Sequence, residues 1–246
     1  MAKQKTSLAI HTEYALAATL VGTLRWLPLP AANGLAKLCA RLLDVALPKL
    51  RRTARINLSF AMPELTAAQQ NRLIDGVFQS IARLLVSVAR FPRLTPVNVK
   101  DLIRYEGLEH FMAAKAAGKG VLVATAHLGN WELSAFSHAY MTEPMNVMVR
   151  PLDNPLIDEL IERRRSLSGN RLLLKKDAAL SVVRALRTGQ TVGILIDQNT
   201  SPEEGVFIDF FGKQACAGAA FAKLASRTGA TVIPGFAFWE QRERRY

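Results

Sequence analysis

The sequence predicts an α/β fold in which a mixed, mainly parallel sheet is flanked by helices and preceded by an all-helical region. From Leu102 onward, short apolar runs alternate with helical patterns, the order typical of a sheet with helical crossovers. The clearest runs, Val121–Ala126 and Thr191–Ile196, are apolar enough to be buried strands. Before Leu102 the periodicity is helical throughout. We therefore divide the chain into a helical region, 1–100, and an α/β core, 101–246.

Composition predicts a basic protein with an apolar character. The 246 residues carry a formal net charge of +12 and are 50% hydrophobic, and the mean hydropathy is +0.11. This combination favours contact with an anionic membrane or an acidic partner. Charge alone would also fit nucleic acid, but no aromatic interleaving or reading module accompanies it, so we expect no nucleic-acid partner. The two cysteines, Cys39 and Cys216, predict neither a disulfide framework nor a zinc site.

The first apolar segment, Leu8–Leu27, predicts a membrane-associated helix. Its uncharged core, Tyr14–Leu24, is too short for an ordinary membrane span. Transmembrane insertion is the second interpretation. The charged and titratable residues that interrupt the segment are His11, Glu13 and Arg25.

Two further helices and a basic cluster complete the helical region. An amphipathic helix is expected at 31–47, and Thr66 and Gln69 have the spacing of a capping box at the start of another, which Pro92 closes. The basic cluster between them is either a solvated face or a surface for anionic headgroups. It consists of Lys49, Arg51, Arg52 and Arg55.

The α/β core supplies further strands and helices in alternation. We expect helices at about 108–117, 130–140, 156–167, 178–187 and 219–228, and strands at 146–150, 171–175 and 231–238. A glycine-punctuated excursion, Ser201–Gly218, receives neither assignment. Parallel α/β sheets bind ligands beyond the carboxyl ends of their strands, and His127, Arg150 and Asp197 all follow predicted strand ends.

The stretch from His127 to Glu132 carries the chemistry that we predict. It links a buried strand to a helix N-terminus, where backbone N–H groups favour developing negative charge. His127 would act as a general base on an acceptor hydroxyl that attacks a thioester, and Glu132 would orient the imidazole. The acceptor supplies the nucleophile, so the enzyme needs none. A structural histidine at the end of a strand is the alternative.

Other chemistries lack a sequence basis. The GxSxG elbow of hydrolases, the Walker A loop and the GxGxxG loop are all absent. No metal site is expected, because the remaining histidines have no ligand spacing with His127. They are His11, His110 and His138.

The block from Ala126 to Glu132 resembles the HxxxxE motif of the bacterial lipid A biosynthesis acyltransferases, the lauroyl/myristoyl acyltransferase family. The motif alone is moderately specific, because glycerolipid acyltransferases carry a related HxxxxD. The ordered set of further matches is highly specific. It comprises Arg51–Pro63, Val149–Pro155, Gly193–Gln198, Gly205–Gly212 and Leu224–Pro234.

The resemblance implies a glycerolipid-acyltransferase-like fold and an inner-membrane enzyme with its site on the cytoplasmic face. Such an enzyme moves a fatty acyl chain from acyl carrier protein, or from coenzyme A, to a hydroxyl of a lipid A precursor, and the acyl donor is a substrate, so no cofactor is implied. By position, His127 is the base and Glu132 its partner. Arg150 would bind an acceptor phosphate. Asp197 would support the site, with a purely structural turn role as an equal alternative.

Three points stay open. Asn130 is kept as a substrate-site candidate, although a role as helix cap is favoured. The acceptor could be another lipid, such as an ornithine lipid, a glycolipid or a lysophospholipid. The family pattern continues beyond the last predicted strand, whereas this chain ends at Tyr246. We therefore expect a truncated core, and an inactive membrane-binding homologue is a further alternative.

Overall fold

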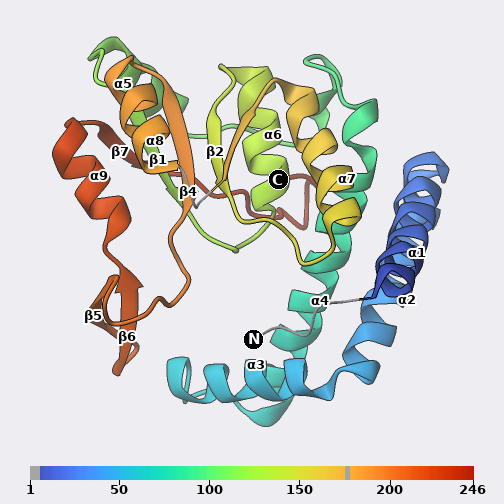
Figure 1. The fold of residues 1–246 in the computed structure, drawn as a ribbon. Coiled ribbons are helices and arrows are strands. Elements are labelled where there is room, and N and C mark those ends of the chain that lie inside the picture. The colour runs from blue at the N-terminus through green and yellow to red at the C-terminus, as the bar shows by residue number, and fades with distance from the viewer. Residues whose placement is uncertain (1–5, 175–177) are drawn as a thin grey trace.

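A five-stranded sheet forms the centre of the protein, whose structure is a computed structural model that describes residues 6–174 and 178–246. The strand order is β3-β2-β4-β1-β7, and every pairing in this sheet is parallel (Figure 1). The predicted α/β class with a mainly parallel sheet is confirmed. The strands are β1 (Val121–Thr125), β2 (Asn146–Val149), β3 (Arg171–Leu174), β4 (Thr191–Leu195) and β7 (Thr231–Pro234).

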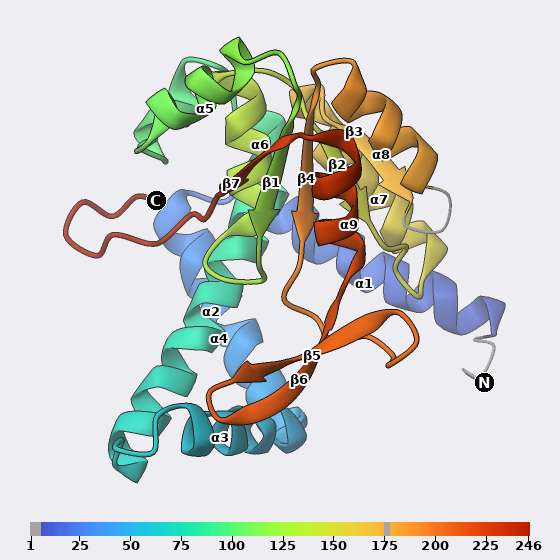
Figure 2. The ribbon, with the colours of Figure 1, turned by 90° about the vertical axis from the view of Figure 1, so that its left-hand side faces the viewer.

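Helices cover both faces of this sheet. Helices α8 (Ala178–Arg187) and α9 (Ala220–Thr228) pack on one face, where Leu122 of β1 lies in their core cluster. Helices α5 (Leu108–Ala116) and α6 (Trp131–Met141) lie on the other (Figure 2). Val121 meets α5 because successive side chains of a strand point to opposite faces. Burial on both faces explains why these strands are apolar without alternation.

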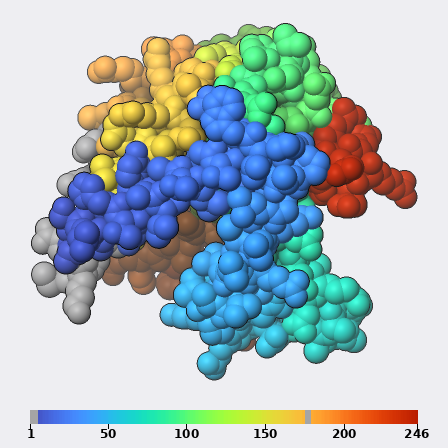
Figure 3. All heavy atoms as spheres, turned by 90° about the vertical axis from the view of Figure 1, so that its right-hand side faces the viewer, coloured from blue at the N-terminus to red at the C-terminus, as the bar shows by residue number. Residues whose placement is uncertain are grey.

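The N-terminal helices form their own core and also pack against the α/β body. Apolar residues of α1 (Ser7–Trp26), α2 (Leu29–Ala46) and α4 (Ala67–Arg90) share one buried cluster. Helix α1 lies along α7 (Pro155–Arg165) on the outside of the body (Figure 3). The Asn154 side chain donates hydrogen bonds to the Ile10 carbonyl at 2.9 Å and the Glu13 carboxylate at 3.0 Å.

No helix in the described ranges is long and apolar enough to span a membrane. The membrane association expected for the N-terminal region stays a prediction. The predicted capping box is present at the start of α4, where Thr66 and Gln69 each satisfy a backbone N–H of the other.

The basic cluster lies on a helix that the sequence did not predict. Helix α3 (Pro48–Ala61) begins with Pro48 in its first turn. Arg51 binds Asp44 of α2 at 2.6 Å and Asp75 of α4 at 2.5 Å, so it ties three helices together. Its hydrogen bonds also hold the pKa of Asp44 below the ordinary range. Arg51 is therefore a structural clamp, whereas Lys49 and Arg52 are exposed.

A β-hairpin occupies the stretch to which the sequence assigned no element. Strands β5 (Gly205–Phe210) and β6 (Lys213–Gly218) pair antiparallel as a separate two-stranded sheet. Both faces of β5 are exposed, so the alternation of apolar and polar residues that reveals a half-buried strand is missing. Lys175, the last residue of the strand predicted at 171–175, lies outside the described residues.

We expect Arg51→Ala to lower the free energy of unfolding by about 1 kcal/mol, because it removes an ion-pair network that links α2, α3 and α4. Arg52→Ala is the matched control on the same helix, since Arg52 is exposed and has no ion pair within the described ranges. Urea unfolding measures both. Equal midpoints would contradict the clamp role of Arg51.

Candidate active site

Two neighbouring strands bring His127 and Asp197 together. Strands β1 and β4 pair in register, with Thr125 opposite Leu195, and each candidate residue follows its strand end by two positions. The imidazole Nδ1 lies 2.9 Å from Asp197 Oδ1, and the backbone N–H of His127 donates to Asp197 Oδ2 at 2.9 Å. One carboxylate oxygen of Asp197 therefore holds the ring of His127, and the other holds its backbone.

This contact determines which nitrogen of His127 carries the proton. A carboxylate accepts hydrogen bonds, so Nδ1 is the protonated nitrogen and Nε2 keeps its lone pair. The His127 and Asp197 side chains are each 35% exposed, and the imidazole packs edge-on against Trp131, with ring centroids 5.0 Å apart. The geometry therefore fixes the orientation of a partly exposed imidazole at the edge of the sheet.

Glu132 pairs with Arg165 and, among the described residues, makes no hydrogen bond to the imidazole. The guanidinium of Arg165, at the end of α7, donates to both oxygens of Glu132, at 2.9 Å and 2.5 Å. The hydrogen bond that the sequence assigned to Glu132 is made by Asp197 instead. The reason is topological: the first turn of α6 directs Glu132 toward α7, whereas the end of β4 lies level with His127.

Arg165 is a residue that the sequence reasoning missed. It closes the run Arg163-Arg164-Arg165, which has the pattern of an exposed basic helix end. Its side chain is nevertheless only 20% exposed. Burial by itself lowers the pKa of Arg165, but the hydrogen bonds and charge of Glu132 outweigh it and raise that pKa above its ordinary value. No spacing in the sequence connects residues 132 and 165.

The turn between His127 and α6 depends on Gly129 and Asn130. Gly129 has φ +69°, and a Cβ there would lie 2.0 Å from the carbonyl oxygen of Ala237. Asn130 is completely buried; it accepts from the Leu133 N–H and donates to Ser87 Oγ of α4. Asn130 therefore caps α6 and anchors the turn to α4. It is absent from the cavity wall, in contrast to its candidate role in substrate binding.

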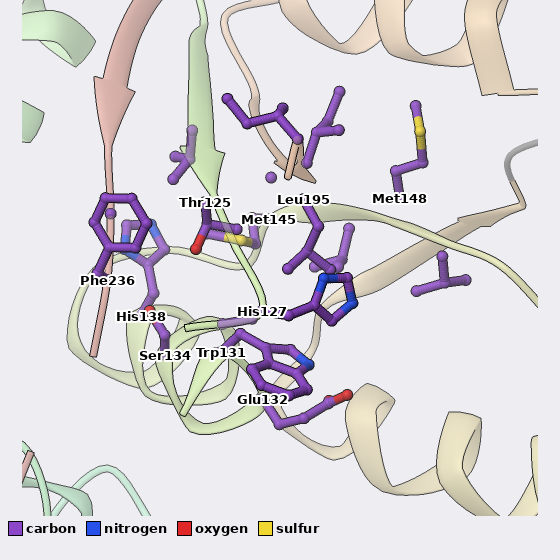
Figure 4. Close-up of a pocket in the computed structure, with 18 of the residues that line it drawn as sticks. Thr125, His127, Trp131, Glu132, Ser134, His138, Met145, Met148, Leu195 and Phe236 are labelled. Carbon is purple, nitrogen blue, oxygen red and sulfur yellow. The ribbon is translucent and has the colours of Figure 1, made fainter. Parts of the chain in front are cut away.

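A cavity of about 1220 Å³ opens beside His127 and extends between the sheet and α6. His127, Trp131 and Glu132 lie at one part of its wall, while Thr125, His138, Met145 and Phe236 lie at another (Figure 4). Four basic residues of the described chain also line it: Arg104 and Arg165, which pair with glutamates, and Arg150 and Lys223. Arg150 is exposed and has no carboxylate partner among the residues that the structure describes. Among the residues that the structure describes, no group of three acidic, histidine or cysteine side chains is arranged to hold a metal ion.

His138 is a buried titratable group in the same wall. Its Nδ1 lies 3.1 Å from the Tyr105 hydroxyl, whereas Nε2 has no hydrogen-bond partner within the described ranges. Burial lowers the pKa of His138 to about 4, aided by the charge of Lys115 and opposed by that of Glu143. His138 is therefore a neutral polar group in a mainly apolar region.

The fold and the site define an α/β protein that places a histidine–aspartate pair at the carboxyl edge of a parallel sheet. The model of the family described as bacterial lipid A biosynthesis acyltransferase matches residues 1–246. The chain belongs to this family.

Several curated proteins resemble the chain over most of its length. A lipid A biosynthesis acyltransferase of Haemophilus influenzae is 28% identical over 200 residues, which cover 80% of this chain and 62% of that protein. The lipid A biosynthesis lauroyltransferase of Escherichia coli is 28% identical over 92% of this chain and 74% of its own length. A phosphatidylinositol mannoside acyltransferase of Mycobacterium tuberculosis is 29% identical over 76% of this chain and 61% of its own length.

We expect Arg165→Met to destabilise the fold by about 3–5 kcal/mol, because it leaves the Glu132 carboxylate buried without its partner. Arg163→Met on the same helix is the matched control, since its side chain is 75% exposed. Adding Glu132→Gln to Arg165→Met should recover part of the loss. Thermal unfolding measures all four proteins, and equal losses in the two single arginine variants would refute the pairing.

A pH dependence of stability should follow from His138. In the unfolded chain its pKa is about 6.5, whereas in the fold it is about 4. The unfolded state therefore binds the proton first, and the free energy of unfolding should fall as the pH drops from about 6.5 to 4. Denaturant titrations across this window should give a flatter profile for His138→Gln than for the unsubstituted protein. Parallel profiles would contradict the low pKa.

Proposed function

We propose that the protein transfers a fatty acyl chain from a thioester to a hydroxyl of a lipid A precursor, with His127 as the general base. The observation that carries this proposal is the His127–Asp197 contact, which leaves Nε2 as a proton acceptor beside the cavity. Membership of the lipid A acyltransferase family supports the reaction class.

The proposed reaction needs one base and no covalent enzyme intermediate. The acceptor hydroxyl attacks the thioester carbonyl carbon while Nε2 of His127 takes its proton. The new C–O ester bond replaces the C–S bond, and the departing thiolate recovers the proton from the imidazolium. Asp197 stabilises the imidazolium through Nδ1, the role of the acid in a catalytic triad. Glu132 contributes by fixing the start of α6 through Arg165.

Charge and position motivate the substrates that we propose. The donor is acyl carrier protein or acyl coenzyme A, and both are acidic, which suits a chain of net charge +12. Arg150 lines the cavity and has no carboxylate partner in the described ranges, so its guanidinium is available to bind a phosphate of the acceptor. We place the enzyme at the cytoplasmic face of the inner membrane. The proposed reaction needs no cofactor, because the acyl donor is itself a substrate.

A different lipid acceptor is the second candidate. The similarity to a phosphatidylinositol mannoside acyltransferase favours a glycolipid among these alternatives. Ornithine lipids and lysophospholipids are the other alternative acceptors. The remaining alternative is that the protein is an inactive homologue.

We expect His127→Ala to lower the turnover number by about 10²–10⁴-fold without unfolding the protein, because only the base is lost. Asp197→Asn should also lower it, since an amide supports the protonated imidazole less well than a carboxylate. Asp101→Asn, at an exposed position outside the cavity wall, is a matched control that should keep full activity. Radiolabelled acyl transfer measures these rates. Equal product from His127→Ala and the unsubstituted protein would refute the base.

The acceptor is tested by offering one acyl-carrier-protein thioester with a lipid A precursor, a mannosylated glycolipid, an ornithine lipid and a lysophospholipid in turn. Product on the lipid A precursor supports the leading proposal. Product on another acceptor alone replaces it, and the absence of product on every acceptor would favour the inactive homologue.

A further inference from the structure

An apolar ribbon projects from the protein at the end where the active site opens. The carboxyl ends of β1 and β4 point toward the end of the molecule that carries the β5–β6 hairpin and α3 (Figures 1 and 2). The two elements appear together at this end in both views, although about 150 residues separate them in the sequence.

The hairpin exposes aromatic residues that the fold does not cover. Phe207 is 62% exposed, Phe210 53% and Phe211 55%. Phe207 and Phe210 point to opposite faces of the ribbon, because three positions separate them along a strand. Val206 and Ile208 are also exposed. An apolar ribbon exposed on both faces cannot bury itself against one flat partner, whereas it can be immersed in an apolar phase.

The tip of the hairpin carries a phenylalanine at a position where the backbone disfavours one. Phe210 pairs with Lys213, so the loop contains only Phe211 and Gly212. Both have positive φ, 54° and 71°, as a type I′ turn requires. Asn-Gly is the preferred sequence for such a turn, and Phe in the left-handed region costs free energy. An aromatic ring in this turn, despite the backbone preference against it, indicates a function.

Helix α3 adds positive charge beside the ribbon. It contains four basic residues and no acidic one. Arg51 faces inward to its carboxylate partners, whereas Lys49, Arg52 and Ile56 are exposed and lie on the outer side at helical spacing. Lys213 places a further exposed cation on the hairpin. Aromatic residues beside cations that have no ion pair among the described residues complement an anionic lipid surface, because the rings suit the acyl chains and the cations suit the phosphate headgroups.

We propose that the β5–β6 hairpin and the outer face of α3 dock together on an anionic membrane, with the hairpin tip inserted, so that the carboxyl edge of the sheet faces the lipid. The inference deepens the proposed function and rests on it, because it states how a lipid acceptor would reach His127. Vesicle binding requires no turnover, so failure of the docking surface is distinguishable from failure of the acyl transfer.

The test is co-sedimentation of the full chain with vesicles of phosphatidylcholine, or of equal parts phosphatidylcholine and phosphatidylglycerol. The protein should bind the anionic vesicles, and binding should weaken at high salt.

Phe211→Asn should weaken binding about fivefold or more while stabilising the turn, since Asn adopts positive φ more readily. Met112→Asn on α5, exposed at the opposite end, is the matched control and should bind normally. The double variant Lys49→Gln, Arg52→Gln should reduce the preference for anionic vesicles by about fivefold per charge.

Three results would overturn the inference. The first is no binding of the unsubstituted protein to anionic vesicles, even if it transfers acyl groups to a detergent-dispersed acceptor. The second is unchanged binding by both the Phe211 and the Lys49/Arg52 variants, which would assign the membrane contact to another surface such as α1. The third is loss of a dimer in Phe211→Asn with no change in vesicle binding, measured by light scattering, which would make a second copy the occupant.

Discussion

The in-register parallel pairing of β1 with β4 is the constraint on which the site depends. Because Thr125 lies opposite Leu195, the residues that follow the two strands emerge side by side. The carboxylate of Asp197 then reaches both the ring and the backbone N–H of His127. A shift of one residue in this register would turn every side chain of the strand to the other face of the sheet and separate the pair. The burial of both strands opposes such a shift, since Leu122 and Val192 are fully buried.

Helix α4 connects the N-terminal helices to this site. Its N-terminal half carries Asp75, which forms an ion pair with Arg51 of α3. Its C-terminal half carries Ser87, whose hydroxyl accepts a hydrogen bond from Asn130 at the start of α6. The turn that presents His127 is therefore held from two sides, by α4 through Asn130 and by the chain after β7, where Ala237 lies against Gly129. Each of these partners is distant in the sequence, so the geometry of the site requires the complete fold.

The alternating pattern of apolar runs and helical segments was enough to predict the class of the core and nearly every element in it. The predictions that failed have local causes. Helix α3 has no buried side chain, and its four basic residues interrupt the helically spaced apolar positions Leu50, Ala54 and Leu58, so the stretch was interpreted only as a basic cluster. The β5–β6 hairpin is exposed on both faces, so its strands lack alternation. His127 and Asp197 were recognisable as residues at strand ends, but their contact was not, because sequence spacing does not specify the order of strands in a sheet.

The sequence alone determined where most strands and helices lie, which residues stand at strand ends, and the ordered motifs that mark the lipid A acyltransferase family. These follow from local periodicity and residue type, which the chain carries along its length. Tertiary structure decided which carboxylate holds which partner: Asp197 binds His127, and Glu132 binds Arg165 across α6 and α7. It also decided that Asn130 is buried as a cap and that Arg51 is a clamp. Hydrogen bonds and ion pairs act over a few ångströms in space, and only the packing of strands and helices brings such distant residues within that range.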